Sequence, residues 1–404
     1  MRILHMADIH ARDEDIDEVK KCLNHIIGLA WQEKPDLIIH AGDTFDSRNV
    51  RLDSKAAKLI FRVFSELANI SPIAVIIGTP THDGNAAEVL QHVHGKNSIW
   101  VSTRPEQIHL LGRHFSKTPW PEPSDAILSM VPAPTKQYFN SQSDIKGSDA
   151  EIAQAMNGIF AGFGAQASEH PCPHILVGHW NTTGSLISET QTLTGVDIEL
   201  SKDAMALANA DLVCLGHIHK RQQLGTNIFY SGSIYRNNYG ELDEKGVYIH
   251  ELVADSCESL GVVSTFHETP TRKLVKLTHD LATEGAMDEV DMVFYGFEPD
   301  DLKDAHLKLE IKVYQDEAGK LDREKIEGVY LSAGAKSVDL KLIRIPRENV
   351  RSERILKLTT LREKLIEQAR LKDETVPESI LAKADILESE PGEHIIVRCA
   401  SLQN

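Results

Sequence analysis

Residues 36–46 read DLIIHAGDTFD, an unbroken apolar run that passes into a glycine and then into Asp43 and Asp46. A short apolar run without alternation is typical of a strand that is buried on both faces, as in a parallel sheet. The first ten residues, MRILHMADIH, have the same order, with Asp8 and His10 after the apolar run. The two stretches therefore predict two buried strands, each followed by a turn that presents polar side chains.

Helical and strand patterns alternate through residues 1–265. Apolar side chains recur at helical spacing in residues 16–32, and residues 54–67 have a second helical pattern. Further apolar runs predict buried strands at residues 73–77, 174–177 and 212–215. In residues 229–252, turn residues separate β-type runs, which predicts strands and hairpins. This alternation indicates a layered α/β domain.

The pattern changes beyond residue 265. A strand, a helix and a strand are predicted at residues 307–314, 322–332 and 337–345, so we expect a small α+β domain over residues 266–346. Residues 347–404 are charged and carry two apolar stripes at helical spacing, which predicts a helical C-terminal segment. Packing within the chain and docking to a partner both account for these stripes.

The composition of the 404 residues, 41% hydrophobic and 25% charged, is that of a soluble globular protein with two or three domains. We find neither an apolar run long enough to span a bilayer nor the features of a signal peptide. The five cysteines form no C-x-x-C pair, so neither a disulfide framework nor a structural zinc site is indicated, and we expect a cytoplasmic protein. The net charge of −17 argues against a broad basic surface for nucleic acid.

Aspartates and histidines gather at the ends of five predicted strands. They are Asp8, His10, Asp43, Asp46, His82, Asp83, His179, His217 and His219. The carboxyl ends of strands in α/β folds form the edge where ligands bind. Carboxylates mixed with imidazoles suit Mn, Fe or Zn better than calcium. Two such ions about 3.5–4 Å apart can hold a phosphate and acidify a water, so the pattern predicts a two-metal phosphoesterase.

The ordered set of motifs resembles the calcineurin-like metallophosphoesterases. The motifs are Asp8-x-His10, GDTFD (42–46), GTPTHDG (78–84), GHW (178–180) and GHIH (216–219). YSGSI (230–234), followed by an acidic stretch and by Lys245-Gly246, resembles the SbcD-type nuclease branch of that family. Each motif alone is a weak signal, whereas the set in this order is specific. The resemblance implies a layered αββα sandwich, a small capping domain and a helical C-terminal segment.

The resemblance also implies how the ligands are shared between two ions. One ion would be held by Asp8, His10, Asp43 and His219. The other would be held by Asp43, His179 and His217, so that Asp43 bridges the pair. His82 would lie over the scissile phosphate and protonate or steer the leaving oxygen, and Asp83 would orient His82.

The segment that carries His82 departs from the family pattern. The family reads G-N-H-D, whereas this chain reads GTPTHD at residues 78–83, two residues longer and without the asparagine. In the family, that asparagine gives its amide oxygen to the second metal. Thr81, directly before His82, is the positional substitute, and Asn181 is the less favoured alternative. Because a neutral hydroxyl is a weaker ligand, the second site is expected to be looser or completed by water.

Other polar residues near the motifs have plainer structural readings. Asp46 is expected to support the ligands rather than to bind metal. His40 fits a buried, hydrogen-bonded histidine as well as a functional one. Lys136 and Arg236 are candidates for phosphate contact, although a solvated charge accounts for each.

The function implied by the resemblance is a Mn-dependent DNA nuclease, both exonuclease and endonuclease, acting in DNA repair and recombination. The expected cofactors are two divalent ions, Mn first, with Fe, Zn or Mg as alternatives. The expected partners are DNA and an SbcC-like ATPase of the SMC type; a homodimer stays open, and no membrane is expected. A phosphatase or cyclic-nucleotide phosphodiesterase acting on small substrates is the alternative, which the acidic charge fits better. A scaffold whose metal site has decayed at Thr81 is a third hypothesis.

Overall fold

The computed structural model describes residues 1–135, 149–188, 191, 198–254, 260–284, 302–346, 355, 357–372 and 374–389. Contacts divide the chain into two compact units. The larger unit comprises Met1–His279, Met287–Ile311 and Asp322–Lys341, and the smaller unit comprises Asp280–Ala286, Lys312–Leu321 and Leu342–Asn404. The domain boundaries expected after residues 265 and 346 remain predictions. Within the described ranges, no helix has the length and apolar character needed to cross a membrane.

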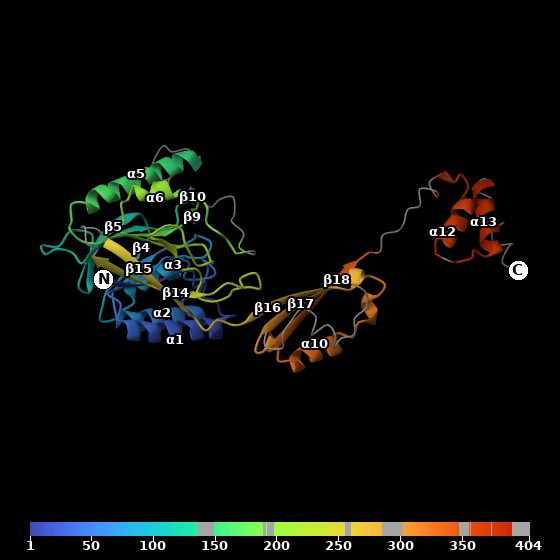
Figure 1. Cartoon of the computed structure of the whole chain (residues 1–404), viewed down its shortest axis with the longest axis horizontal. Helices are drawn as coiled ribbons and strands as arrows, with labels where there is room; N and C mark the ends of the chain where they lie inside the picture. The colour runs from blue at the N-terminus through green and yellow to red at the C-terminus, as the bar shows by residue number, and fades with distance from the viewer. Residues whose placement is uncertain are drawn as a thin grey trace. The chain divides into compact units, whose positions relative to one another are not determined.

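Two sheets form the centre of the larger unit (Figure 1). In spatial order, the first sheet contains β15 (Leu260–Glu268), β14 (Gly246–Ala254), β1 (Arg2–Met6), β2 (Leu37–His40), β3 (Ile73–Ile76) and β4 (Ile99–Ser102). The second sheet contains β12 (Gln222–Gln223), β13 (Ile228–Tyr230), β11 (Leu212–Gly216), β8 (His174–His179), β7 (Ala126–Val131), β5 (Glu106–Leu111) and β6 (His114–Ser116). Strands β1 to β4 pair in parallel, as do β7, β8, β11 and β13. The parallel strands predicted from the apolar runs are therefore confirmed.

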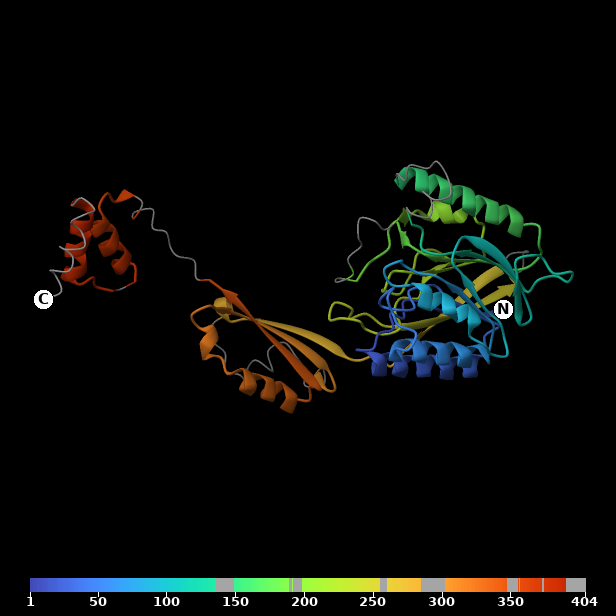
Figure 2. The ribbon, with the colours of Figure 1, turned by 180° about the vertical axis from the view of Figure 1, so that it is seen from behind.

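Helices cover the outer face of each sheet, as the two views in Figures 1 and 2 show. The first sheet is covered by α1 (Ile16–Glu33) and α2 (Lys55–Ala68), and the second by α5 (Asp149–Ala167) and α6 (Lys202–Ala206). Shorter elements are α3 (Asn85–Glu88), the 3-10 turn η1 (Val89–His92) and the two-stranded sheet of β9 (Asn181–Thr182) and β10 (Glu199–Leu200).

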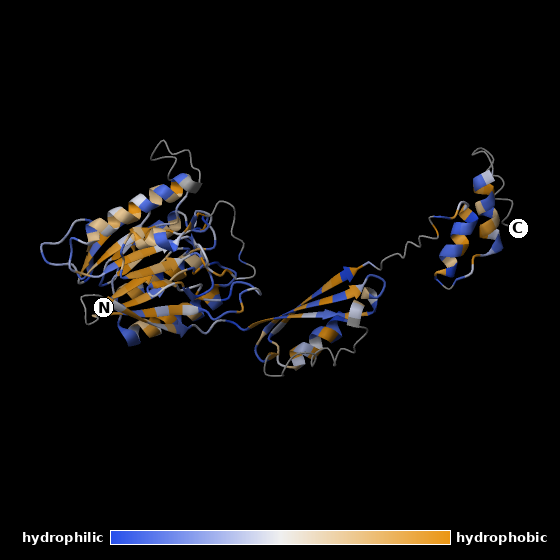
Figure 3. Ribbon diagram, turned by 45° about the horizontal axis from the view of Figure 1, so that its top comes forward, coloured by the Kyte–Doolittle hydropathy of each residue, from blue (hydrophilic) through white to orange (hydrophobic). Residues whose placement is uncertain are grey.

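The side-chain alternation of the strands explains the layers. In β1, Leu4 and Met6 pack with the residues of α1 and α2, whereas Ile3 faces the second sheet. In β11, Leu212 and Cys214 belong to the core between the sheets. Because successive side chains of a strand point to opposite faces, a strand buried on both faces must be apolar throughout. The strands are accordingly among the most hydrophobic segments (Figure 3), and the αββα sandwich is confirmed.

The two predicted N-terminal helices begin and end for local reasons. Helix α1 ends at Lys34, which takes a left-handed conformation and donates its backbone N–H to the Ala30 carbonyl. Helix α2 begins after Ser54, whose hydroxyl accepts the N–H of Ala57 at 3.1 Å. Both helices bury one apolar face, as their helical spacing predicted.

The C-terminal third contains a further sheet and a helical pair. A three-stranded sheet has the order β16 (Leu274–Asp280), β17 (His306–Tyr314) and β18 (Ser337–Ile345), and the helical elements are α7 (Leu281–Glu284), η2 (Ala318–Lys320) and α10 (Arg323–Ser332). The predicted strand–helix–strand order is thus present. The last helices are α12 (Leu361–Arg370) and α13 (Glu378–Ser389). Helix α12 begins only at residue 361 because Thr360 and Glu363 form a capping box there.

Candidate metal centre

The loops that follow the parallel strands meet at one edge of the sandwich. The backbone N–H of Asp8 donates to the Gly42 carbonyl and that of His10 donates to the Asp43 carbonyl, each at 3.0 Å. Asp8, His10, Asp43 and His217 have positive φ angles of 53°, 44°, 52° and 89°. Side-chain-bearing residues rarely adopt this region, and such strain gathers at functional sites. The backbone is therefore bent to present these four side chains.

A first cluster is formed by Asp8, His10 and His219. Their potential ligand atoms all lie within 4.8 Å of one another. Nε2 of His10 is 2.9 Å from Nε2 of His219, and the Asp8 carboxylate accepts the backbone N–H of His217 at 2.9 Å. Asp8 and His10 are buried, so this cluster places a carboxylate and two imidazoles in a closed space.

A second cluster is formed by Asp43, His179 and His217, whose potential ligand atoms also lie within 4.8 Å of one another. Nδ1–H of His179 donates to the Ala41 carbonyl at 2.7 Å, and its Nε2 lies 3.2 Å from the Asp43 carboxylate. Nε2 of His217 is buried and makes no hydrogen bond within the part of the chain that the structure describes. Because a buried polar atom normally has a partner, this imidazole nitrogen is suited to a bound cation.

Asp43 lies between the two clusters. The same oxygen, Oδ2, is 3.2 Å from Nε2 of His179 and 3.7 Å from Nε2 of His10. Asp43 is thus the carboxylate that faces both groups of imidazoles. This placement fits the bridging role that the family resemblance implies.

Burial and neighbouring charges determine the protonation states of these side chains, and a bound cation requires deprotonated ligand atoms. Burial, together with His219, holds the pKa of His10 well below its usual range, and burial with His179 lowers the pKa of His217 to about 3. Burial opposes ionisation of Asp43, but the charge and hydrogen bond of His179 outweigh it and hold the pKa of Asp43 well below its usual range. Neutral imidazoles at His10 and His217 and an ionised Asp43 are the ligand forms of a metal site. Burial opposes protonation of His179, but Asp43 outweighs it and raises the pKa of His179 to about 9, so a cation there would displace the proton of His179. The two clusters therefore fit two divalent ions.

Thr79 occupies the position that the sequence assigned to Thr81. The hydroxyl of Thr79 is 3.0 Å from Oδ2 of Asp43 and 3.2 Å from Nε2 of His179. Thr81 is exposed, and its carbonyl accepts the N–H of Arg48 at 2.9 Å. The two extra residues displace Thr81 outward, so its adjacency to His82 was misleading. We therefore correct the prediction: Thr79 is the hydroxyl beside the second cluster.

Gly78 allows the close approach of this segment to Asp43, whereas the side chain of Asn181 is engaged elsewhere. A Cβ at Gly78 would lie 2.2 Å from the backbone nitrogen of Asp43, so only glycine permits this approach. Asn181, the alternative substitute, uses its side-chain oxygen to accept the hydroxyl of Ser185 at 2.8 Å.

His82 faces the first cluster, although Asp83 does not hold it there. The ring centroids of His82 and His10 are 4.6 Å apart, and Nδ1 of His82 is 3.0 Å from the Asp46 carbonyl. The Asp83 carboxylate accepts the backbone N–H groups of Thr44, Phe45 and Gly78. Asp83 thus ties two loops together, and the Asp46 carbonyl orients His82. The expected role of Asp83 is corrected accordingly.

The structure also places the remaining candidates. Nε2 of His40 is 2.9 Å from the Thr44 hydroxyl, which fits a structural histidine. The guanidinium of Arg236 donates to the carbonyls of Leu242, Asp243 and Arg272 rather than standing free for phosphate. Lys136 lies outside the described residues.

Sequence reasoning missed two features that depend on packing. His5, Cys214 and His250 form a third group of possible ligands, but it lies within strands rather than on the loops, and Nδ1 of His5 is 3.3 Å from Nε2 of His250. Glu241 contacts His219 at 2.9 Å. The acidic stretch before Lys245-Gly246 was the only sequence signal for Glu241.

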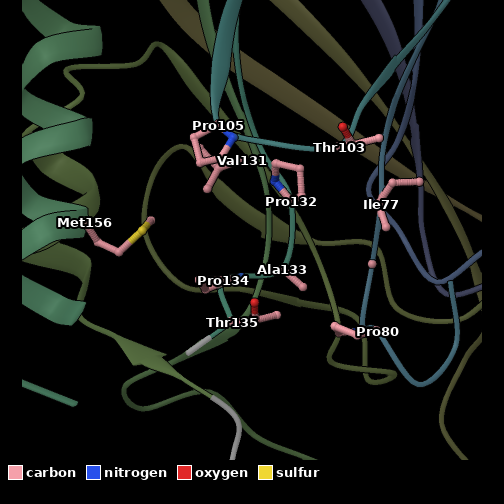
Figure 4. A pocket seen from close by; sticks show the side chains of 11 residues that line it. Ile77, Pro80, Thr103, Pro105, Val131, Pro132, Ala133, Pro134, Thr135 and Met156 are labelled. Atoms are coloured by element: carbon pink, nitrogen blue, oxygen red, sulfur yellow. The ribbon is translucent and has the colours of Figure 1, made fainter. Parts of the chain in front are cut away.

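An uncharged cavity of about 170 Å³ lies beside the segment that carries Thr79 (Figure 4). Gly78 and Pro80, on either side of Thr79, line one wall of it. The other lining residues are Ile77, Thr103, Pro105, Val131, Pro132, Ala133, Pro134, Thr135 and Met156. Such a lining suits an apolar or planar part of a substrate better than a phosphate.

Comparison with known proteins agrees with this geometry. The model of the calcineurin-like phosphoesterases matches residues 1–221. The SbcD component of the SbcCD nuclease from Staphylococcus epidermidis is 26% identical over 262 residues, which cover 61% of this chain and 65% of that protein, slightly less than two thirds of it. The component of the same name from Escherichia coli K12 is 25% identical over 302 residues, covering 70% of this chain and 72% of that protein.

The family match covers more than half of the 404 residues, and both clusters lie within it. The chain therefore belongs to the calcineurin-like phosphoesterases, which are metal-dependent hydrolases.

Proposed function

We propose that this protein is a Mn-dependent DNA nuclease that hydrolyses phosphodiester bonds at a dinuclear centre. Its metal ligands would be Asp8, His10, Asp43, Thr79, His179, His217 and His219. The observation that carries the proposal is the placement of the Asp43 carboxylate between two buried histidine clusters. Two divalent ions held there would bind the phosphate, acidify a water and stabilise the departing oxygen.

The protein's own contribution at the leaving group would come from His82. Its Nδ1 is engaged by the Asp46 carbonyl, which leaves Nε2 to act on the substrate. When Nε2 also carries a proton, this imidazolium can give that proton to the departing oxygen, a step that contributes typically about 10²–10⁴-fold to rate. The uncharged cavity beside Thr79 offers room for a neighbouring part of the substrate.

DNA is the proposed substrate because both relatives are named as parts of a nuclease and because the family motifs extend into the YSGSI segment. The chain continues beyond the two-sheet sandwich into a third sheet and a helical pair, and an enzyme for small substrates would not need these additional parts. We propose that it acts in the cytoplasm in DNA repair and recombination.

The proposed partner is an SbcC-like ATPase, to which the C-terminal helices would dock. Ile366 on α12 is 46% exposed, and Ile380 and Leu387 on α13 are 46% and 50% exposed. Apolar side chains on short amphipathic helices are suited to a groove on a partner. A double variant, Ile380→Glu with Leu387→Glu, should abolish co-purification with the ATPase and leave turnover of bis-p-nitrophenyl phosphate unchanged. Retained co-purification would place the docking surface elsewhere.

The activity is tested with the purified full-length protein and Mn. Turnover is compared for bis-p-nitrophenyl phosphate, cyclic nucleotides, linear duplex DNA and single-stranded DNA, with Asp43→Asn as the inactive control. We expect cleavage of both DNA substrates by the wild type only. If bis-p-nitrophenyl phosphate is cleaved but both DNAs stay intact even with the ATPase present, the nuclease proposal is wrong while the metal centre stands.

A phosphatase or cyclic-nucleotide phosphodiesterase is the second candidate. The net charge of −17 favours it, because affinity for DNA usually rests on basic groups that neutralise phosphates. Preferential turnover of a cyclic nucleotide in the same comparison would select this function.

A further inference from the structure

We propose that Glu241 is a positioning residue for the first metal cluster, fixing His219 so that its Nε2 points at the cation, with Lys245 holding Glu241 in place. This inference rests on the proposed metal centre. It gives a role to the acidic stretch and Lys-Gly pair after YSGSI, which the sandwich and the two clusters leave unexplained.

The geometry at His219 defines which nitrogen carries the proton. Nδ1 of His219 is 2.9 Å from Oε1 of Glu241, and Nε2 of His219 is 2.9 Å from Nε2 of His10. A carboxylate can only accept, so Nδ1 must be the protonated nitrogen of a neutral His219. The lone pair of Nε2 is therefore directed into the cluster. Metal-binding histidines generally show this arrangement, in which the outer nitrogen donates to a carboxylate or a carbonyl.

The carboxylate of Glu241 is held from several sides. Its Oε2 lies 3.0 Å from Nζ of Lys245 and accepts the Ser233 hydroxyl at 3.3 Å, while Oε1 accepts the side-chain N–H of Asn238 at 3.2 Å. Glu241 and Lys245 are each 1% exposed. The buried carboxylate is thus fixed in position as the acceptor for Nδ1 of His219.

Lys245 acts on the same histidine through the backbone. Its Nζ donates to the His219 carbonyl at 2.9 Å, so one ammonium links the main chain of His219 to the carboxylate that binds its side chain. This linkage limits both the position and the rotation of the imidazole.

In the second cluster, a backbone carbonyl rather than a carboxylate orients the histidine ring. There, Nδ1 of His179 donates to the backbone carbonyl of Ala41 at 2.7 Å. A backbone carbonyl cannot be removed by substitution, whereas Glu241 can. A change at Glu241 should therefore weaken one ion and spare the other, which a general loss of stability would not do.

The test measures Mn binding by isothermal titration, with dinuclear and mononuclear Mn distinguished by electron paramagnetic resonance. The variants are Glu241→Gln and, as a matched control, Glu244→Gln. Glu244 lies in the same stretch, pairs with Arg221 and is exposed. We expect two equivalents for the wild type and for the control. In Glu241→Gln, one ion should bind about 10–100-fold more weakly and the other with unchanged affinity.

A second measurement needs no variant at Glu241. Nitrogen NMR of the wild type loaded with diamagnetic Zn, with the His219 signal assigned from His219→Gln, should show Nδ1–H and a metal-bound Nε2. The opposite tautomer would overturn the inference, as would two tightly bound ions in Glu241→Gln. A wild type that binds no Mn at all would instead overturn the proposed metal centre, so the two failures are distinguishable.

Discussion

Nε2 of His10 lies 2.9 Å from Nε2 of His219, although the two residues are 209 positions apart in the chain. Two imidazole nitrogens at this distance share either one proton or one cation. Burial and His219 hold the pKa of His10 well below its usual range, so a second proton is disfavoured there. With the Asp8 carboxylate beside them, these nitrogens form half of a site that a divalent ion would satisfy.

Thr79 and Thr81 make a matched pair for the second ion. Thr79→Val removes the hydroxyl beside Asp43 and His179, and we expect the affinity for the second Mn to fall by about 10-fold or more. Thr81→Val changes an exposed side chain and should leave both affinities unchanged. Titration with Mn measures both. A loss in Thr81→Val alone would restore the assignment made from the sequence.

Asp43→Asn tests the bridge between the clusters. Asparagine tolerates the left-handed backbone of this position, so the variant should fold. We expect phosphodiester turnover to fall by more than about 100-fold, because changes in outer-shell partners alone cost about 10–100-fold. The number of Mn equivalents should also fall below two. Asp53→Asn, at an exposed carboxylate, is the control, and a fully active Asp43→Asn enzyme would contradict the assignment.

His82→Ala separates an acid catalyst from a ligand. We expect kcat for bis-p-nitrophenyl phosphate to fall by about 10²–10⁴-fold while two Mn equivalents remain bound. A metal-ligand role for His82 is the competing hypothesis, because possible ligand atoms of His10, Asp46 and His82 also lie within 4.8 Å of one another. A loss of one equivalent in His82→Ala would make His82 a ligand. His92→Ala, at an exposed histidine, is the control.

Buried His250 should make the protein sensitive to mild acid. Burial lowers the pKa of His250 to about 3, whereas an unfolded histidine titrates near 6.5. Between these values the unfolded state binds more protons, so stability falls as the pH falls below about 6.5. When the pH is lowered from about 7.5 to about 5.5, His250 should lower the free energy of unfolding by about 1.4 kcal/mol.

Urea denaturation with chelator present measures this dependence on pH. In His250→Gln, the drop in the free energy of unfolding between the two pH values should be smaller by that amount, whatever the absolute stability of the variant. His92→Gln, on the exposed surface, is the control. An equal drop in His250→Gln and the wild type would show that His250 does not carry the effect.

The sequence by itself determined the strands, the layers and most of the candidate metal ligands. Apolar runs such as residues 36–41 can be satisfied only between two layers, and the parallel pairing of such strands brings their carboxyl ends to one edge. Asp8, Asp43 and His179 could therefore be chosen as candidates from their places at or just beyond the ends of strands. Both clusters contain the residues that the motifs predicted.

Only the tertiary structure decided which side chains support these ligands. The hydroxyl of Thr79 rather than that of Thr81 lies beside the second cluster, and the Asp83 carboxylate accepts loop N–H groups. Neither contact could be predicted, because residue order does not give the backbone path of the two-residue insertion. Glu241 meets His219 across 22 positions, through a fold that no local pattern encodes. Strand periodicity is a local property, whereas a hydrogen bond between distant loops depends on distances set by the packing of the whole sandwich.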